Sequence, residues 1–350
     1  MPRLALAAWV LTLVVAGCGV GESTTIDGPV TVYVSLPLTG PRSADGRDAA
    51  DGARLALEQA GGKAGSIEVR PRFLDDAQGK NWDPVVVGAN ARRAAQDAST
   101  AAYIGELDSA PTRASVPITN DAGILQVSPG AGAVDLTAPA AGYPDSPDRY
   151  QPSGSPNFVR TVPSDAVVVE AAAEWASDLG ATRAEVSSDG SAFEQLSAAE
   201  FRSAAALHGV QVVPASAAAS GAESSYEPAS QRLEVDGGLY ELSAQLDPSR
   251  LPGKAFVSDF ETRFQRPPGP YAAYGYEAMS LVLQAVRGAG TDASSFRDNV
   301  RLGVFGVHRD GTVLGSYAIT SDGDTTECMI QRYRIEDRGR VPLGAPCPTE

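Results

Sequence analysis

The chain has 350 residues, of which 43% are hydrophobic and 20% are charged. This balance is typical of a globular protein and argues against a chain that is disordered throughout. The formal net charge of −15 argues against nucleic acid as a partner, because phosphate binding needs a basic face. The length is comfortable for two domains of ordinary size.

The first seventeen residues have the pattern of an export signal. Arg3 supplies a positive charge, and residues 4–15 form an apolar run interrupted only by Thr12. The run is shorter than the roughly 20 residues that cross a bilayer, and it has the length of a signal-peptide core. It ends in small residues before Cys18, which resembles a bacterial lipobox, where the cysteine receives a diacylglycerol anchor. An ordinary secretory peptide with an incidental cysteine is the alternative.

We therefore expect a signal peptide at residues 1–17, a tether at 18–29, and a protein held by lipid on the extracytoplasmic face of the cell membrane. Apart from Cys18, the sequence contains Cys328 and Cys347. Outside the cytoplasm, such a pair favours a disulfide. This bond would hold the C-terminal tail against the body of the protein.

Strands and helices alternate along most of the chain. Runs rich in β-branched residues predict strands at 30–36, 67–74, 101–104, 124–128, 158–162, 184–187, 210–213 and 238–243. Helical spacing and capping residues predict helices at 44–60, 84–98, 112–121, 165–179, 193–209, 253–264 and 271–289. This alternation indicates parallel sheets covered on both faces. Residues 143–157 form a proline-rich loop, and the Ala-, Ser- and Gly-rich residues 215–228 favour a linker or exposed loop.

Several short motifs resemble the leucine/isoleucine/valine-binding family of ABC-transporter substrate-binding proteins. They follow one another in the order of that family: VSLPLTG at 34–40, DGARLA at 51–56, YIG at 103–105, VSP at 127–129, DLT at 135–137, FVRT at 158–161, PSD at 163–165, PYAAY at 270–274 and DGDT at 322–325. Each motif is weak by itself, but the ordered set extends over nearly the whole chain after the signal.

The resemblance implies a fold class of type α/β, with two doubly wound parallel-sheet lobes joined by crossovers. Residues 30–157 with 246–316 are expected to form the first lobe. Residues 158–245 with 317–350 are expected to form a second lobe, shortened because residues 214–237 replace about two βα units of the relatives.

The family binds its ligand in the cleft between the lobes, and its contacts map onto particular residues here. Ser109 stands where relatives use a serine hydroxyl on the ligand carboxylate. The loop of Gly130, Ala131 and Gly132 would offer backbone groups, Phe193 would replace a stacking tyrosine, and Asp165 begins the first helix of the second lobe. Ser109 and Asp165 also suit simple helix capping. The relatives' acid for the ligand ammonium falls in the replaced segment, where Glu223, Glu227, Glu234 and Asp236 are substitutes or merely solvated charges.

The resemblance implies a lipid-anchored binding protein of an ABC importer, with an ABC permease as partner and an amino acid, amide or other small carboxylate as ligand. The alternative is a degenerate, receptor-like lipoprotein that acts as a sensor or interaction module without transport. No enzyme is expected, because the two histidines lack a G-x-S-x-G nucleophile elbow. We expect no cofactor and no metal, since no His and Cys cluster has ligand spacing.

Overall fold

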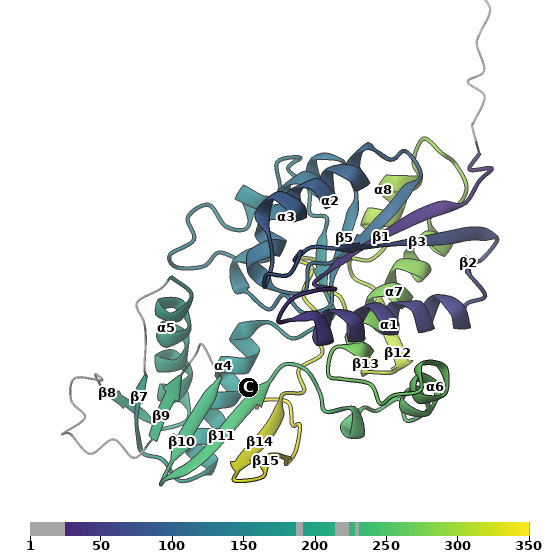
Figure 1. The fold of residues 1–350 in the computed structure, drawn as a ribbon. Coiled ribbons are helices and arrows are strands. Elements are labelled where there is room, and N and C mark those ends of the chain that lie inside the picture. The colour runs from purple at the N-terminus through teal and green to yellow at the C-terminus, as the bar shows by residue number, and fades with distance from the viewer. Residues whose placement is uncertain (1–24, 187–191, 214–223, 228–230, 350) are drawn as a thin grey trace, which may run out of the picture.

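The computed structural model describes residues 25–186, 192–213, 224–227 and 231–349. The described chain forms two lobes, each built on its own sheet (Figure 1). Within this part of the chain, no helix has the length and apolar character needed to cross a membrane. Cys18 precedes the described residues, so the expected lipid anchor remains a prediction.

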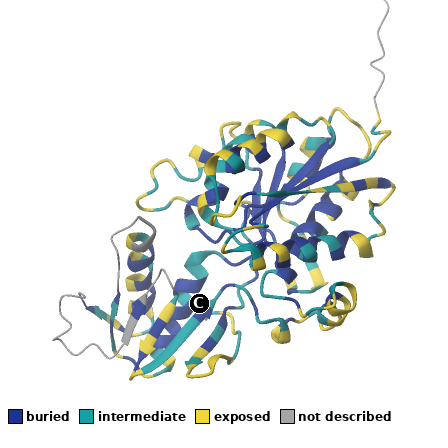
Figure 2. Ribbon diagram, in the orientation of Figure 1, coloured by how far each residue is buried: buried dark blue, intermediate teal, exposed yellow. Residues whose placement is uncertain are grey.

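The first lobe is built on a six-stranded sheet with the order β2-β3-β1-β4-β5-β6. β2 runs antiparallel to β3, and all other neighbours run parallel. Every residue of the central strand β1 is buried, as expected for a parallel sheet covered on both faces (Figure 2). The strands are β1 (Val30–Leu36), β2 (Lys63–Ala64), β3 (Ile67–Asp75), β4 (Thr100–Ile104), β5 (Leu125–Ser128) and β6 (Phe158–Arg160).

Helices cover both faces of this sheet. α2 and α3 pack together on one face, and α1 and α7 pack together on the other, where α8 lies against α7 and β4 (Figure 1). α6 packs beside α1. The helices are α1 (Ser43–Gln59), α2 (Pro84–Gln96), α3 (Ser109–Asp121), α6 (Ala255–Phe264), α7 (Ala272–Gly288) and α8 (Phe296–Leu302). A small hairpin of β12 (His308–Thr312) and β13 (Gly315–Ala318) follows α8.

The second lobe is built on a seven-stranded mixed sheet with the order β15-β14-β11-β10-β9-β7-β8. Only β7 with β8 and β7 with β9 are parallel; the other four pairings are antiparallel. Two helices, α4 (Asp165–Asp178) and α5 (Ala192–Leu207), pack together and accompany it. The strands are β7 (Arg183–Val186), β8 (Gln211–Val213), β9 (Ser224–Glu227), β10 (Arg232–Val235), β11 (Gly238–Ser243), β14 (Gln331–Glu336) and β15 (Gly339–Pro342).

The expectation of a wholly parallel second sheet is therefore wrong. The reason lies in β10, where Leu233 and Val235 are buried while Arg232 and Glu234 are exposed. This alternation suits a sheet with one wet face, which antiparallel hairpins tolerate and parallel sheets do not. The linker expected at 215–228 is also wrong for residues 224–227, which form β9. Residues 214–223 and 228–230 lie outside the described residues.

Three crossovers join the lobes and meet around Tyr274 of α7. The first follows β6, whose pairing with β5 puts residues 158–160 in the first sheet rather than in the second lobe. Tyr274 Oη donates to Ala244 O at 2.9 Å and accepts from Leu246 N at 3.0 Å, which holds the second crossover. Thr161 Oγ1 of the first crossover donates to Tyr274 O. The third crossover, residues 319–330, leads into β14.

The C-terminal tail is fastened to the third crossover and to the second lobe. Cys328 and Cys347 form a disulfide. Ile330 N donates to Pro346 O, and Thr349 donates through N and Oγ1 to Glu174 of α4.

Candidate ligand site between the lobes

The candidate site begins at the loops that follow β4, β5 and β6. In a parallel sheet these loops share one edge, and ligands bind beyond the carboxyl ends of the strands. Here that edge leads to the second lobe, since the chain passes directly from β6 into α4. The arrangement brings Ser109, the loop after β5 and Asp165 together.

The polar groups of the loop after β5 are largely bonded within the first lobe. Ser128 Oγ accepts from Gly130 N at 3.2 Å and from Ala131 N at 2.9 Å. Ser109 Oγ accepts from Ala133 N at 3.0 Å, so this hydroxyl holds the loop. Of these loop amides, only that of Gly132 has no hydrogen-bond partner among the described residues. Ligand binding by Ser109, Gly130, Ala131 and Gly132 stays a prediction.

Arg160 holds the loop after β5 in place through hydrogen bonds to its backbone carbonyls. Its side chain is fully buried, and Nη1 donates to Ala131 O at 3.1 Å and to Ala133 O at 2.9 Å. Nη2 donates to Thr137 Oγ1, and Nε pairs with Asp324 of the third crossover at 2.6 Å. One guanidinium therefore joins the loop to the connection between the lobes.

Gly132 allows the loop to meet the first turn of α4. Asp165 N donates to Gly132 O at 2.7 Å. A Cβ atom added at Gly132 would overlap Oδ1 of Asp165. The absence of a side chain at Gly132 therefore lets the Asp165 carboxyl approach the first lobe.

A small cavity of about 10 Å³ lies between the lobes at this point. Such a volume holds roughly one water molecule. α3 and the segment after β5 line it from the first lobe, and α4 and α5 line it from the second; the polar lining residues are Arg113, Asp135, Tyr143, Asp165, Ser197 and Glu200. Phe193 belongs to α5, but its side chain lies outside the described residues.

The first-lobe wall is a closed ion-pair network. Arg113 binds Asp135 through Nε at 2.7 Å and Nη2 at 2.5 Å, and its guanidinium lies over the ring of Tyr143. Tyr150 Oη donates to the same Asp135 carboxylate at 2.6 Å. The Asp135 side chain is 1% exposed, so this charge is neutralised almost entirely by groups of the first lobe.

The second-lobe wall carries two carboxyl groups without such partners. Burial raises the pKa of Asp165 to about 6, although Arg160 and Arg113 act in the opposite direction. Burial, and then the charge of Asp165, raise the pKa of Glu200 to about 7. Oε2 of Glu200 is buried and has no hydrogen-bond partner in the described structure. Ionisation of either carboxyl group is therefore less favourable here than in water.

A polar cluster at the edge of the first lobe completes the surroundings. Arg42 pairs with Asp45 at 2.8 Å and with Asp108 at 3.0 Å, and it donates to Tyr271 Oη at 3.1 Å. The Tyr271 ring lies against the position that a Cβ atom of Gly130 would occupy. These charges also compensate one another within the lobe.

Comparison with known protein families decides the identity of this two-lobed arrangement. A family described as "Periplasmic binding protein" matches residues 29–238. The chain belongs to this family. A search of curated proteins finds no match for this periplasmic binding protein.

Solved structures share the fold of this periplasmic binding protein. An ABC transporter substrate-binding protein from Desulfitobacterium hafniense in complex with Leu has a TM-score of 0.71 at 19% identity, covering 90% of this chain and 100% of that chain. A leucine binding protein from Thermotoga maritima has a TM-score of 0.69 at 20% identity, with coverages of 91% and 99%. A solute binding protein from R. palustris in complex with benzoate has a TM-score of 0.70 at 17% identity, with coverages of 92% and 97%.

The type I periplasmic-binding fold expected from the motifs is thus confirmed. The expected shortening of the second lobe is not confirmed, since the solved neighbours are covered over nearly their whole length.

The sequence prediction named Asp165 but missed Arg113 and Glu200, two other charged residues that line the cavity of this periplasmic binding protein. Arg113 stands four residues after Ser109 on α3, and Glu200 stands seven residues after Phe193 on α5. Both spacings return to the same helix face. Extending each predicted contact along its helix face would have found them.

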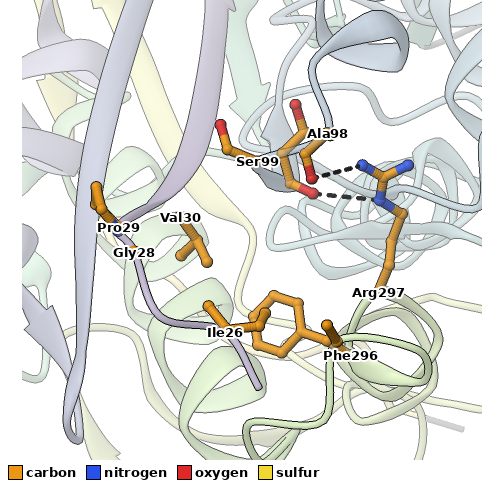
Figure 3. Close-up of a pocket in the computed structure, with 10 residues that line it drawn as sticks. Ile26, Gly28, Pro29, Val30, Ala98, Ser99, Phe296 and Arg297 are labelled. Carbon is orange, nitrogen blue, oxygen red and sulfur yellow. Dashed lines mark hydrogen bonds between the residues drawn. The ribbon is translucent and has the colours of Figure 1, made fainter. Parts of the chain in front are cut away.

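A larger hollow, of about 510 Å³, lies at the opposite end of the first sheet (Figure 3). Ile26, Val30 and Phe296 form its apolar part, and Arg297 closes one side. The guanidinium of Arg297 donates to backbone carbonyls, including those of Ala98 and Thr100. This hollow lies at the amino ends of β1 and β4, away from the second lobe. Ligands bind beyond the carboxyl ends of parallel strands, so the interlobe cavity is the candidate ligand site instead.

Proposed function

We propose that this chain is a lipid-anchored, extracytoplasmic solute-binding protein of an ABC importer that captures an amino-acid-like ligand between its lobes. The observation that carries this proposal is the interlobe cavity, which is lined by charged side chains from both lobes. A ligand that contacts both lobes stabilises the closed form over the open one, and a permease can read this difference.

The solved neighbours support this proposal. Those in complex with Leu and with benzoate are described as ABC transporter proteins that bind solutes, and the fold is shared over about 90% of this chain.

The position of the tether supports anchoring by Cys18. Ile26 N donates to Thr291 O, and Thr25 forms an isolated bridge with Asp292. These contacts lie at the amino ends of the first-lobe strands, on the side away from the second lobe (Figure 1). Residues 18–24 reach at most about 25 Å when extended, so an anchor at Cys18 leaves the cavity end free for ligand and permease.

A thermal-shift screen of the purified full chain against amino acids, amides and small carboxylates tests ligand capture. We expect the melting temperature to rise with at least one amino-acid-like ligand, because binding to the folded state alone stabilises it. Silence across the screen would contradict the transport proposal.

Membrane fractionation of a Cys18→Ser variant tests the anchor, and we expect this variant in the soluble fraction.

The second candidate is a sensor or interaction module that has lost ligand binding. The observation that favours it is the cavity volume of about 10 Å³, which is too small for an amino acid unless the lobes part. The same thermal-shift screen separates the two functions, because a module without a ligand gives no shift.

A further inference from the structure

We propose that the ligand carries a cationic nitrogen, such as a primary ammonium group, which lies between Asp165 and Glu200, and that a ligand carboxylate is dispensable. This inference rests on the proposed function and names the substrate class of the same site. It differs from the amino acid, amide or other small carboxylate that the resemblance implies, because it needs no carboxylate, and Glu200 is a residue that the sequence did not single out.

The first step is that the first lobe offers little to an anion. Three of the four loop amides after β5 already donate to the hydroxyls of Ser128 and Ser109. A ligand carboxylate would have to displace these internal bonds to use them. Only the Gly132 amide, among the described residues of the loop, is left for an incoming acceptor.

The second step is that the cations at the cavity are already committed. Arg113 is bidentate to Asp135, and Arg160 is bonded to Asp324 and to loop carbonyls. Bidentate Arg–carboxylate pairs are the stronger kind of ion pair, so an external carboxylate competes poorly with Asp135.

The third step is that the second lobe presents uncompensated negative charge. Neither Asp165 nor Glu200 forms an ion pair with a described residue, and Oε2 of Glu200 is buried without a partner. The charge of Asp165 adds to the cost of ionising Glu200. A cation between the two carboxylates would offset this repulsion and would compensate for the hydration that the carboxylates lose on burial.

The fourth step is size. An ammonium head group is close in size to a water molecule, which is what a cavity of about 10 Å³ holds. A carboxylate group, with one carbon and two oxygen atoms, is larger than an ammonium group and larger than this volume. The remainder of the ligand has to extend from this point and keep the lobes further apart than they lie here.

Three compounds that share a 3-methylbutyl unit test the charge preference: leucine, isopentylamine and 4-methylpentanoate. Calorimetric titration of the purified full chain at pH 8 should show binding of isopentylamine and of leucine. We expect 4-methylpentanoate to bind at least about tenfold more weakly, since it lacks the group that compensates the carboxylates.

A Glu200→Gln variant identifies the residue responsible. We expect its affinity for isopentylamine to fall about tenfold, and an Asp165→Asn variant should lose affinity as well. Glu261→Gln, a change at an exposed acid of α6, is the matched control and should leave affinity unchanged. Far-ultraviolet circular dichroism and melting temperatures establish that the variants are folded.

The pH dependence provides a second readout. Isopentylamine binding should strengthen as the pH rises from 6 to 8, because Glu200 and Asp165 lose their protons in this range. The slope should flatten in Glu200→Gln. The other charged or titratable groups that face these two are Asp135, Arg113, Arg160, Tyr143 and Tyr226.

The outcomes separate the inference from the proposed function. Tight binding of 4-methylpentanoate, with Glu200→Gln indistinguishable from the parent chain, overturns the inference and leaves solute capture standing. Silence of all three compounds, while the wider screen yields a ligand without a cationic nitrogen, has the same consequence. Silence of every compound in both experiments overturns the inference together with the proposed function.

Discussion

Arg160 shows how one buried residue organises a site without facing the ligand. Its guanidinium bonds two loop carbonyls, a threonine hydroxyl and the carboxylate of Asp324, with no exposed surface. The FVRT motif marked this position in the sequence, but the partners of its side chain are up to 164 residues away. The sequence therefore located Arg160 without revealing its role.

An Arg160→Lys variant should lower the free energy of unfolding by about 3–5 kcal/mol. A lysine lacks the planar set of donors, so it leaves loop carbonyls or the Asp324 carboxylate unpaired in a buried place. Urea unfolding followed by circular dichroism measures the change, with Arg338→Lys at an exposed position as the control. An unchanged unfolding midpoint would show that the loop does not depend on these bonds.

Glu327 is a buried acid in the third crossover. Its side chain accepts from Met329 N through Oε1, while Oε2 is buried without a partner among the described residues. Burial raises the pKa of Glu327 to about 8, and the bond from Met329 only partly opposes this. The crossover therefore contains a carboxyl group that prefers to stay protonated at neutral pH.

A Glu327→Gln variant should weaken the pH dependence of stability. Because the folded pKa of about 8 lies above the unfolded value, the stability attached to this group is complete below about pH 4.5 and is lost as the pH rises to 8. The loss is on the order of a few kcal/mol in the parent chain and absent in the variant. Urea unfolding at pH 5, 7 and 9 measures it, with Glu261→Gln as control; parallel pH profiles for Glu327→Gln and the parent would refute this account.

At the scale of elements, the local pattern predicted the strands and helices of the first lobe well. The predicted range 30–36 coincides with β1, and the range 84–98 differs from α2 by two residues at one end. Runs of buried β-branched residues and helical spacing are local properties, which is why they can be read from the sequence. Helix α8 was missed, because its seven residues are too few to establish a period.

The strands of the second lobe were predicted less well, because strand direction depends on pairing between distant segments. Pairing of β11 with β14 joins residues about ninety positions apart. Asp310 and Gly311 lie inside β12 at an irregularity of pairing, and the chain reverses after Thr312. A dipeptide that favours a turn is equally suited to a bulge.

The disulfide joins the third crossover to the C-terminal tail over 19 residues. A Cys328→Ser, Cys347→Ser double variant should lose about 3 kcal/mol of stability, because closing a loop of this length restricts the unfolded chain by that amount. Thermal unfolding of the double variant and of the parent, each with and without reductant, measures this loss. Reductant should lower the melting temperature of the parent only; an equal effect on both would point to a different cause.

At the scale of the molecule, the proposed ligand capture requires the distance between the lobes to change. The cavity of about 10 Å³ has no room for a whole ligand, and the crossovers around Tyr274 are the three connections on which the lobes can turn. Hinge closure around a ligand is the ordinary motion of two-lobed binding proteins.

Small-angle scattering should detect this motion. We expect the radius of gyration of the full chain to decrease when leucine or isopentylamine is added at saturating concentration, because the free lobes part widely enough to admit the ligand and the bound ligand then holds them closer together. Addition of 4-methylpentanoate is the control and should leave the radius unchanged. If calorimetry shows saturation and the radius stays constant, the lobes do not close on the ligand.

The sequence by itself determined the class of fold and the family, since these follow from local periodicity and motif order. It favoured a disulfide between Cys328 and Cys347, but only the tertiary structure showed the two sulfur atoms bonded. Only the tertiary structure showed that the second sheet is mixed and that serine hydroxyls accept hydrogen bonds from the amides of the loop after β5. It alone placed Arg113 against Asp135 and left Glu200 beside Asp165 without a cation. The physical reason is that charge compensation depends on which distant side chains share a buried space, and no local pattern encodes that neighbourhood.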